Sequence, residues 1–119
     1  MAEVTQTILH GDPQGRQGNC LQAAVASLLD LPLDDVPHFV EADDWTACLV
    51  DWAAEQGWLA RYARPDAPVA LGIACGPSPR GVHHAVVMRD GVVVWDPHRS
   101  RDGLVKIGMI VEFSRIGAA

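Results

Sequence analysis

The chain has 119 residues, of which 49% are hydrophobic, and its formal net charge at pH 7 is −6. This length and composition predict one domain spanning residues 1–119 with a single modest core. The acidic balance, with scattered Lys and Arg, argues against a nucleic-acid partner, and the lack of a long apolar run or a secretory signal argues against a membrane partner and favours a cytoplasmic location.

The first part of the chain predicts a strand, a turn and then a helix that begins at a cysteine. Alternation over residues 4–9 favours an edge strand, and Gly-Asp-Pro at residues 11–13 favours a turn. Apolar residues then recur at the spacing of one helical face from Cys20 to Leu29, with Gly18 and Asn19 as the expected break and cap. Cys20 would lie in the first turn, where the helix dipole favours an ionised thiol.

The rest of the chain predicts a second helix and then a sheet. Pro32 ends the first helix, and the acids after it favour a single helical turn within residues 30–37. A second helix is expected over residues 45–56. From Trp58 onward the period changes, and we expect strands over residues 58–62, 69–75, 83–89, 92–96 and 105–113. The fold class expected is therefore α+β, with N-terminal helices packed on a C-terminal antiparallel β-sheet.

One expected hairpin brings a histidine close to a carboxylate. Asp90-Gly91 predicts a two-residue turn that folds His84, at the start of one strand, near Asp96, at the end of the next. A carboxylate that holds one imidazole nitrogen leaves the other nitrogen to take a thiol proton. If the sheet lies over the start of the first helix, Cys20 is the nucleophile, His84 the base and Asp96 the group that orients it. The Gln14 amide and the Cys20 backbone N–H could then hold the oxyanion.

These four residues resemble the pattern of papain-like cysteine peptidases, which place a glutamine six positions before a helix-opening cysteine and a histidine and an Asn or Asp further on. The His-Ala-Val-Val strand and the later Asp-Pro are most similar to the leader-peptide peptidase domains of bacteriocin exporters. Cys-Leu-Gln-Ala and residues 31–39 also look like short papain-like proteins encoded by bacteria and their phages. The resemblance implies a papain-like fold, a peptide or protein substrate and no cofactor. It favours His84 over the adjacent His83 as the base, a choice that strand alternation alone leaves open.

Our first hypothesis is a thiol hydrolase that cleaves a peptide or amide bond. The same thiol chemistry would serve an acyltransferase, a transglutaminase or a glutamine deamidase, and a non-catalytic papain-like binding module is a further alternative. The residues expected around the substrate are Asn19, His83, Arg80 and Trp95. Arg80 is read either as a solvated loop tip or as a partner for a substrate carboxylate.

The remaining cysteines and histidines are expected to be structural or exposed. Three cysteines without close spacing favour reduced thiols, and we expect Cys48 and Cys75 to behave as small buried apolar residues. No metal site is expected, because His83 and His84 point apart on a strand and supply no tight pair of zinc ligands. The sequence does not predict the oligomeric state.

Overall fold

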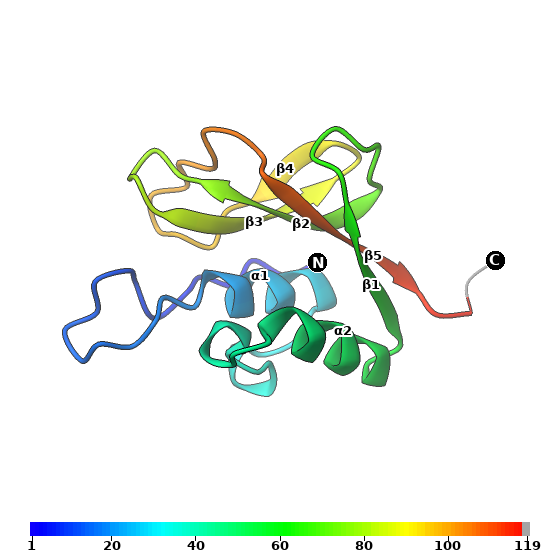
Figure 1. Cartoon of the computed structure of the whole chain (residues 1–119), viewed down its shortest axis with the longest axis horizontal. Coiled ribbons are helices and arrows are strands. Elements are labelled where there is room, and N and C mark those ends of the chain that lie inside the picture. The colour runs from blue at the N-terminus through cyan, green and yellow to red at the C-terminus, as the bar shows by residue number, and fades with distance from the viewer. Residues whose placement is uncertain (118–119) are drawn as a thin grey trace.

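The computed structural model describes residues 1–117 and contains two α-helices packed against one five-stranded antiparallel sheet (Figure 1). The strands are β1 (Trp58–Ala63), β2 (Leu71–Pro77), β3 (His83–Arg89), β4 (Val92–Trp95) and β5 (Met109–Arg115). They lie in the order β1-β5-β2-β3-β4, so β5 pairs with both β1 and β2. The expected α+β class, with helices packed on a later antiparallel sheet, is confirmed.

The two helices cover one face of the sheet. Helix α1 (Cys20–Leu29) packs on β3 and β2, and α2 (Trp45–Glu55) packs on β1. Two short 3-10 helices, Leu33–Asp35 and Phe39–Glu41, join them, and only the first was expected. The main core lies between this layer and the sheet, where its large buried members include Leu21, Val25, Leu49, Ile73, Val87 and Phe113. Within residues 1–117, neither helix is long and apolar enough to cross a bilayer.

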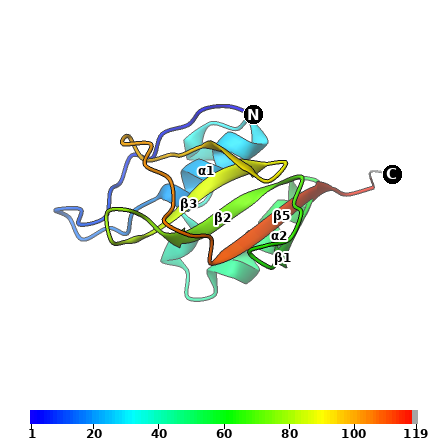
Figure 2. The same cartoon turned by 90° about the horizontal axis from the view of Figure 1, so that it is seen from above.

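Connecting segments cover the opposite face of the sheet. A second apolar cluster joins Val86, Met88 and Ile110 of the strands to Val69, Leu104 and Ile107 of the connections. The connection from β4 to β5, orange in Figure 2, crosses the ends of β3 and β2 on its way to β5. Because both faces are covered, five consecutive residues of β3 are buried, from His84 to Met88.

Three expected segments differ from the structure. Residues 4–9 form no strand, because their backbone groups bind helix α1 and the end of the β3–β4 hairpin instead of a sheet edge. Strand β2 is displaced by two residues and β5 begins at Met109. The cause at β5 is a close crossing: a Cβ on Gly76 would lie 2.2 Å from the Lys106 carbonyl oxygen, so only glycine lets residues 105–108 bend over β2.

The β3–β4 hairpin has the expected turn and an unexpected bulge. Asp90 and Gly91 have φ of 53° and 79°, the paired positive values of a type I′ turn. Val93 pairs with Met88, but Val87, the residue before Met88, pairs with Trp95, so Val94 is an extra residue in β4. The bulge puts Trp95, in place of Val94, opposite Val87 on the face that packs against α1.

Candidate active site

A cleft of about 1130 Å³ lies where the start of α1 meets the start of β3. Cys20 and His84 both line it, together with Gln6, His83, Arg80 and His98. Its other walls are the projecting loop of residues 9–17 (Figure 1) and an apolar side that includes Leu21, Val40, Trp45 and Met109. The hairpin and helix therefore bring the expected nucleophile and base to one cleft.

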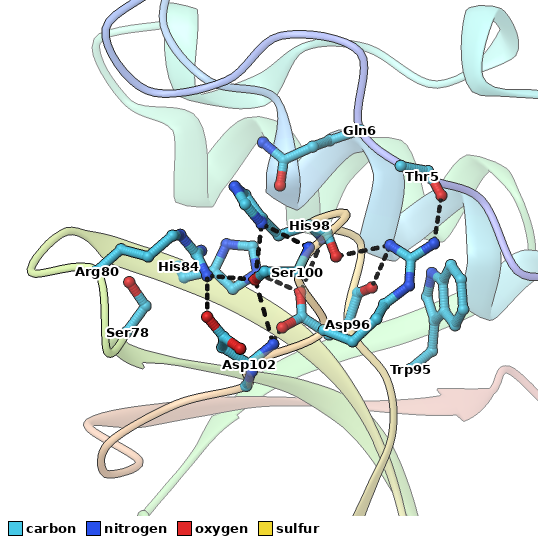
Figure 3. Close-up of polar contacts among 12 residues, drawn as sticks. Thr5, Gln6, Ser78, Arg80, His84, Trp95, Asp96, His98, Ser100 and Asp102 are labelled. Atoms are coloured by element: carbon cyan, nitrogen blue, oxygen red, sulfur yellow. Dashed lines mark hydrogen bonds and ion pairs between the residues drawn. The ribbon is translucent and has the colours of Figure 1, made fainter.

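His84 and Asp96 form a buried pair beside this cleft. His84 Nε2 lies 2.5 Å from Asp96 Oδ1, and the two side chains are only 3% and 4% exposed. The backbone N–H of His98 also donates to the Asp96 carboxylate at 2.8 Å (Figure 3). The backbone N–H of Gly103 donates to the same carboxylate at 2.7 Å. Burial alone would raise the pKa of Asp96, but these hydrogen bonds outweigh it and lower that pKa. Asp96 is thus a fixed acceptor for His84 Nε2, and no hydrogen bond to His84 Nδ1 is found among the described residues.

Cys20 is the first residue of α1, as expected, but its surroundings do not favour ionisation. Burial raises the pKa of the Cys20 thiol, and hydrogen bonds from the backbone N–H groups of Ala85 and Leu21 offset this only in part. The expectation of an easily ionised thiol is therefore wrong, because desolvation exceeds the effect of the helix start. Among residues 1–117 no hydrogen bond joins Cys20 Sγ to His84, and burial favours the neutral thiol over the thiolate.

The structure brings a different glutamine to the cleft from the one expected. Gln14 is exposed at the projecting loop, where its backbone N–H donates to Asp12, and it is not among the residues that line the cleft. Gln6 lines the cleft and is 8% exposed. Its Nε2 donates to the Ile8 carbonyl at 2.8 Å, and its buried Oε1 has no hydrogen-bond partner among the described residues. Gln6 is thus a preoriented amide with one N–H left to donate.

Asn19 holds the segment that carries Gln6. It is 2% exposed, and its Oδ1 accepts from the backbone N–H groups of Thr7 and Ile8 at 3.0 and 2.8 Å. It is the N-cap residue of α1, as expected, but its side chain makes no cap hydrogen bond to the helix. Its amide nitrogen donates to Thr7 and Gln22, so both ends of its side chain are used within the protein. Asn19 therefore positions the segment, and it does not line the cleft where a substrate contact was expected.

The end of the hairpin holds the same segment from the other side. The Trp95 indole N–H donates to the Val4 carbonyl at 2.8 Å, and the Gln6 N–H donates to the Pro97 carbonyl at 3.0 Å. Arg101 stacks over Trp95 and donates to Thr5 Oγ1 at 3.0 Å. Trp95 does not line the cleft, where a substrate contact was expected. It helps to position the segment that carries Gln6 instead. No local sequence pattern pointed to Gln6 or Arg101, since both act through residues distant in the chain.

The remaining expected residues lie at the rim or away from the cleft. His83 is exposed and lines the cleft, and Arg80 lines it from the β2–β3 loop. Cys75 also lines the cleft, where burial and the neighbouring Cys20 raise its pKa to about 12. Cys48 is exposed, contrary to the expectation that it is buried, because it faces outward on α2. No group of three His, Cys, Asp or Glu side chains within residues 1–117 could hold a metal ion.

Comparison with known proteins adds no relative. No protein-family model matches the chain, and neither the curated proteins nor the solved structures contain a match.

Proposed function

We propose that the protein is a thiol hydrolase of papain-like type that cleaves a peptide or amide bond through Cys20, His84 and Asp96. The observation that carries this proposal is the buried His84–Asp96 pair in contact with a cleft that also holds a helix-opening cysteine. A buried histidine paired with a carboxylate, on a cleft that also holds a cysteine, matches the base, orienting group and nucleophile of a thiol hydrolase.

The proton of the Cys20 thiol moves to His84 Nδ1 as Sγ attacks the substrate carbonyl carbon. Because burial raises the pKa of Cys20, this transfer accompanies the attack and does not precede it. Asp96 accepts a hydrogen bond from Nε2 and so stabilises the imidazolium that forms. His84 then protonates the leaving amine, which gives a thioester. Water hydrolyses the thioester with His84 as base, which releases the acid and restores the thiol.

The negative charge on the carbonyl oxygen needs donors that are already in place. The Cys20 backbone N–H lies in the first turn of α1, where N–H groups have no partner within the helix. The second N–H of the Gln6 amide is the side-chain candidate, because the first is bound to Ile8 and fixes the orientation of the amide. We therefore assign to Gln6 the oxyanion role that the sequence alone suggested for Gln14.

Alkylation with iodoacetamide, followed by mass spectrometry of each cysteine, tests the thiol chemistry. We expect Cys20 to react faster than the exposed Cys48, although burial protects it and raises its pKa. Changing His84→Ala is expected to slow this labelling roughly 100-fold, the scale of general-base catalysis. His83→Ala, which removes the neighbouring imidazole, is the matched control and should leave the rate nearly unchanged.

Two results would contradict the hydrolase. One is labelling of Cys20 at or below the rate of Cys48 in the folded protein. The other is a rate at Cys20 that His84→Ala does not change.

A further inference from the structure

The charge of the cleft differs from that of the whole protein. The chain carries 15 Asp and Glu against nine Lys and Arg, yet among the described residues Asp12 is the only acidic side chain that lines the cleft. The cationic and ionisable side chains along it are more numerous: His10, Arg16, Arg80, His83, His84 and His98. Two arginines against one aspartate mean that the lining is not acidic, unlike the protein as a whole, so it is open to an anionic ligand.

Of the two arginines in the cleft, one is occupied within the protein and the other has donors to spare. Arg16 binds Asp12 through two hydrogen bonds of 3.0 Å, and this pairing lowers the pKa of Asp12 to about 2. Arg80 uses only Nη1, which donates to Ser100 Oγ at 3.0 Å and lies 3.9 Å from the half-exposed Asp102. Among the described residues, Arg80 Nε and Nη2 therefore have no acceptor, and they form the planar fork that suits a carboxylate.

A chain of contacts joins Arg80 to His84 through Ser100 and His98, and Arg80, His84 and His98 all line the cleft. Ser100 Oγ connects the Arg80 guanidinium to His98 Nδ1, which it contacts at 2.9 Å (Figure 3). The His98 ring in turn packs edge-on against His84, with ring centroids 6.0 Å apart. Because His84 must reach the leaving nitrogen to protonate it, a group attached just beyond that nitrogen comes close to Arg80 and His98.

We propose that the cleft binds a carboxylate on the leaving-amine side of the scissile bond, with Arg80 as its ion-pair partner. This inference rests on the proposed hydrolase. The carboxylate has two chemical sources, namely the C-terminus of a leaving amino acid or the side chain of an acidic residue within a longer peptide. Arg80 is a specificity-determining residue and takes no part in the proton transfers.

Matched alkylating probes test the site without a known substrate. Bromoacetyl-glycine and bromoacetyl-glycine amide differ only in a terminal carboxylate, whereas bromoacetyl-aspartate amide and bromoacetyl-asparagine amide differ only in a side-chain carboxylate. The rate at Cys20 is divided by the rate of the same probe at Cys48, which removes differences in intrinsic reactivity. Measurements at pH 8 and low salt keep the screening of Arg80 small.

We expect the acid probe of one pair to label wild-type Cys20 roughly three- to ten-fold faster than its amide, the effect of one nearby charge at partial screening. The pair that shows the preference identifies the source of the carboxylate. Arg80→Gln should abolish the preference and Arg80→Lys should retain part of it. Arg64→Gln, which removes the same charge at a fully exposed loop site, is the control and should retain it.

Two outcomes would overturn the carboxylate site: equal labelling by the acid and amide probes of both pairs, or a preference that Arg80→Gln leaves intact. These outcomes are distinct from failure of the hydrolase, because the ratio of acid to amide does not depend on how fast Cys20 reacts. A slow Cys20 that still prefers acids would refute the hydrolase and keep the site. Fast labelling of Cys20 that depends on His84 but shows no preference for the acid probes would support the hydrolase and refute the carboxylate site.

Discussion

At the scale of single residues, two glutamines were candidates for the oxyanion donor. The sequence spacing favours Gln14, whereas the geometry of the cleft favours Gln6. Gln6 lines the cleft with its amide fixed by Ile8, whereas Gln14 is exposed on the projecting loop. A donor to the oxyanion must be in place before the charge develops, since its reorganisation during the reaction would cancel the gain. Of the two, only Gln6 meets this condition.

Acylation and alkylation of Cys20 distinguish an oxyanion donor from a residue that merely supports the thiol. We expect Gln6→Ala to slow acylation by p-nitrophenyl acetate roughly 100-fold, because that attack creates an oxyanion. Alkylation by iodoacetamide creates none, so its rate should change little. Gln14→Ala should leave both rates unchanged. Equal slowing of the two reactions by Gln6→Ala would mean that the residue acts on the thiol or on the fold.

Local sequence context was sufficient to place His84 near Asp96 and Cys20 at the start of a helix, whereas their meeting at one cleft was expected only if the sheet lay over that helix start. Cys20 follows a loop and begins an amphipathic helix, and His84 and Asp96 flank a two-residue turn, so short-range patterns determine their neighbours. Gln6 has no such pattern. Its position depends on Asn19 and Trp95, which are bound to its segment through tertiary contacts that no periodicity encodes. The raised pKa of Cys20 was missed for the same reason, since burial is a property of the assembled core.

At the scale of elements, the bulge in β4 determines which of its residues faces α1 and holds the N-terminal segment. In a regular ladder without the bulge, the residue after Val93 would lie opposite Val87, and that residue is Val94 and not Trp95. Trp95 would then lose the face on which its indole reaches Val4. Strand propensity predicted β4 itself, because valine and tryptophan favour strands, but the bulge adds no recognisable residue type to the sequence.

The link between α1 and the N-terminal segment gives a prediction at this scale. Asn19→Ala leaves the N–H groups of Thr7 and Ile8 without their acceptor, which should lower the free energy of unfolding by roughly 2–4 kcal/mol. Urea denaturation followed by circular dichroism measures this loss. The same variant should slow acylation of Cys20 as Gln6→Ala does, because Gln6 is no longer held. A stability close to that of wild type would show that Asn19 does not anchor the segment.

At the scale of the whole molecule, the site contributes to stability in a pH-dependent way. The pKa of Asp96 in the folded protein is lowered below its ordinary value of 3.8, so the unfolded chain binds a proton more readily in acid. The stabilisation is complete above the unfolded pKa and is lost as pH falls through the folded pKa. The protein should therefore lose stability on acidification below about pH 4.

Urea midpoints of the wild type and of Asp96→Asn, measured between about pH 6 and pH 2, test this linkage. The variant should be less stable near neutral pH, and its stability should fall less steeply in acid because it has no carboxylate to protonate at this site. Asp12, whose pKa is also low, is present in both proteins and cancels in the comparison. Parallel pH dependences for the two proteins would contradict a role for Asp96.

The way in which residues 4–8 are held also determines which part of the molecule unfolds first. A strand in a sheet separates only when its ladder breaks, but this segment is attached through individual bonds to Asn19, Ser27, Trp95 and Pro97. Such a segment can open locally while the sheet and both helices stay folded. Heat or denaturant would then displace Gln6, the proposed oxyanion donor, before it melts the core, so that the proposed reaction stops in a protein whose circular dichroism is still native. The thermal limit of the proposed hydrolase would be set by residues 4–8 and not by the stability of the domain.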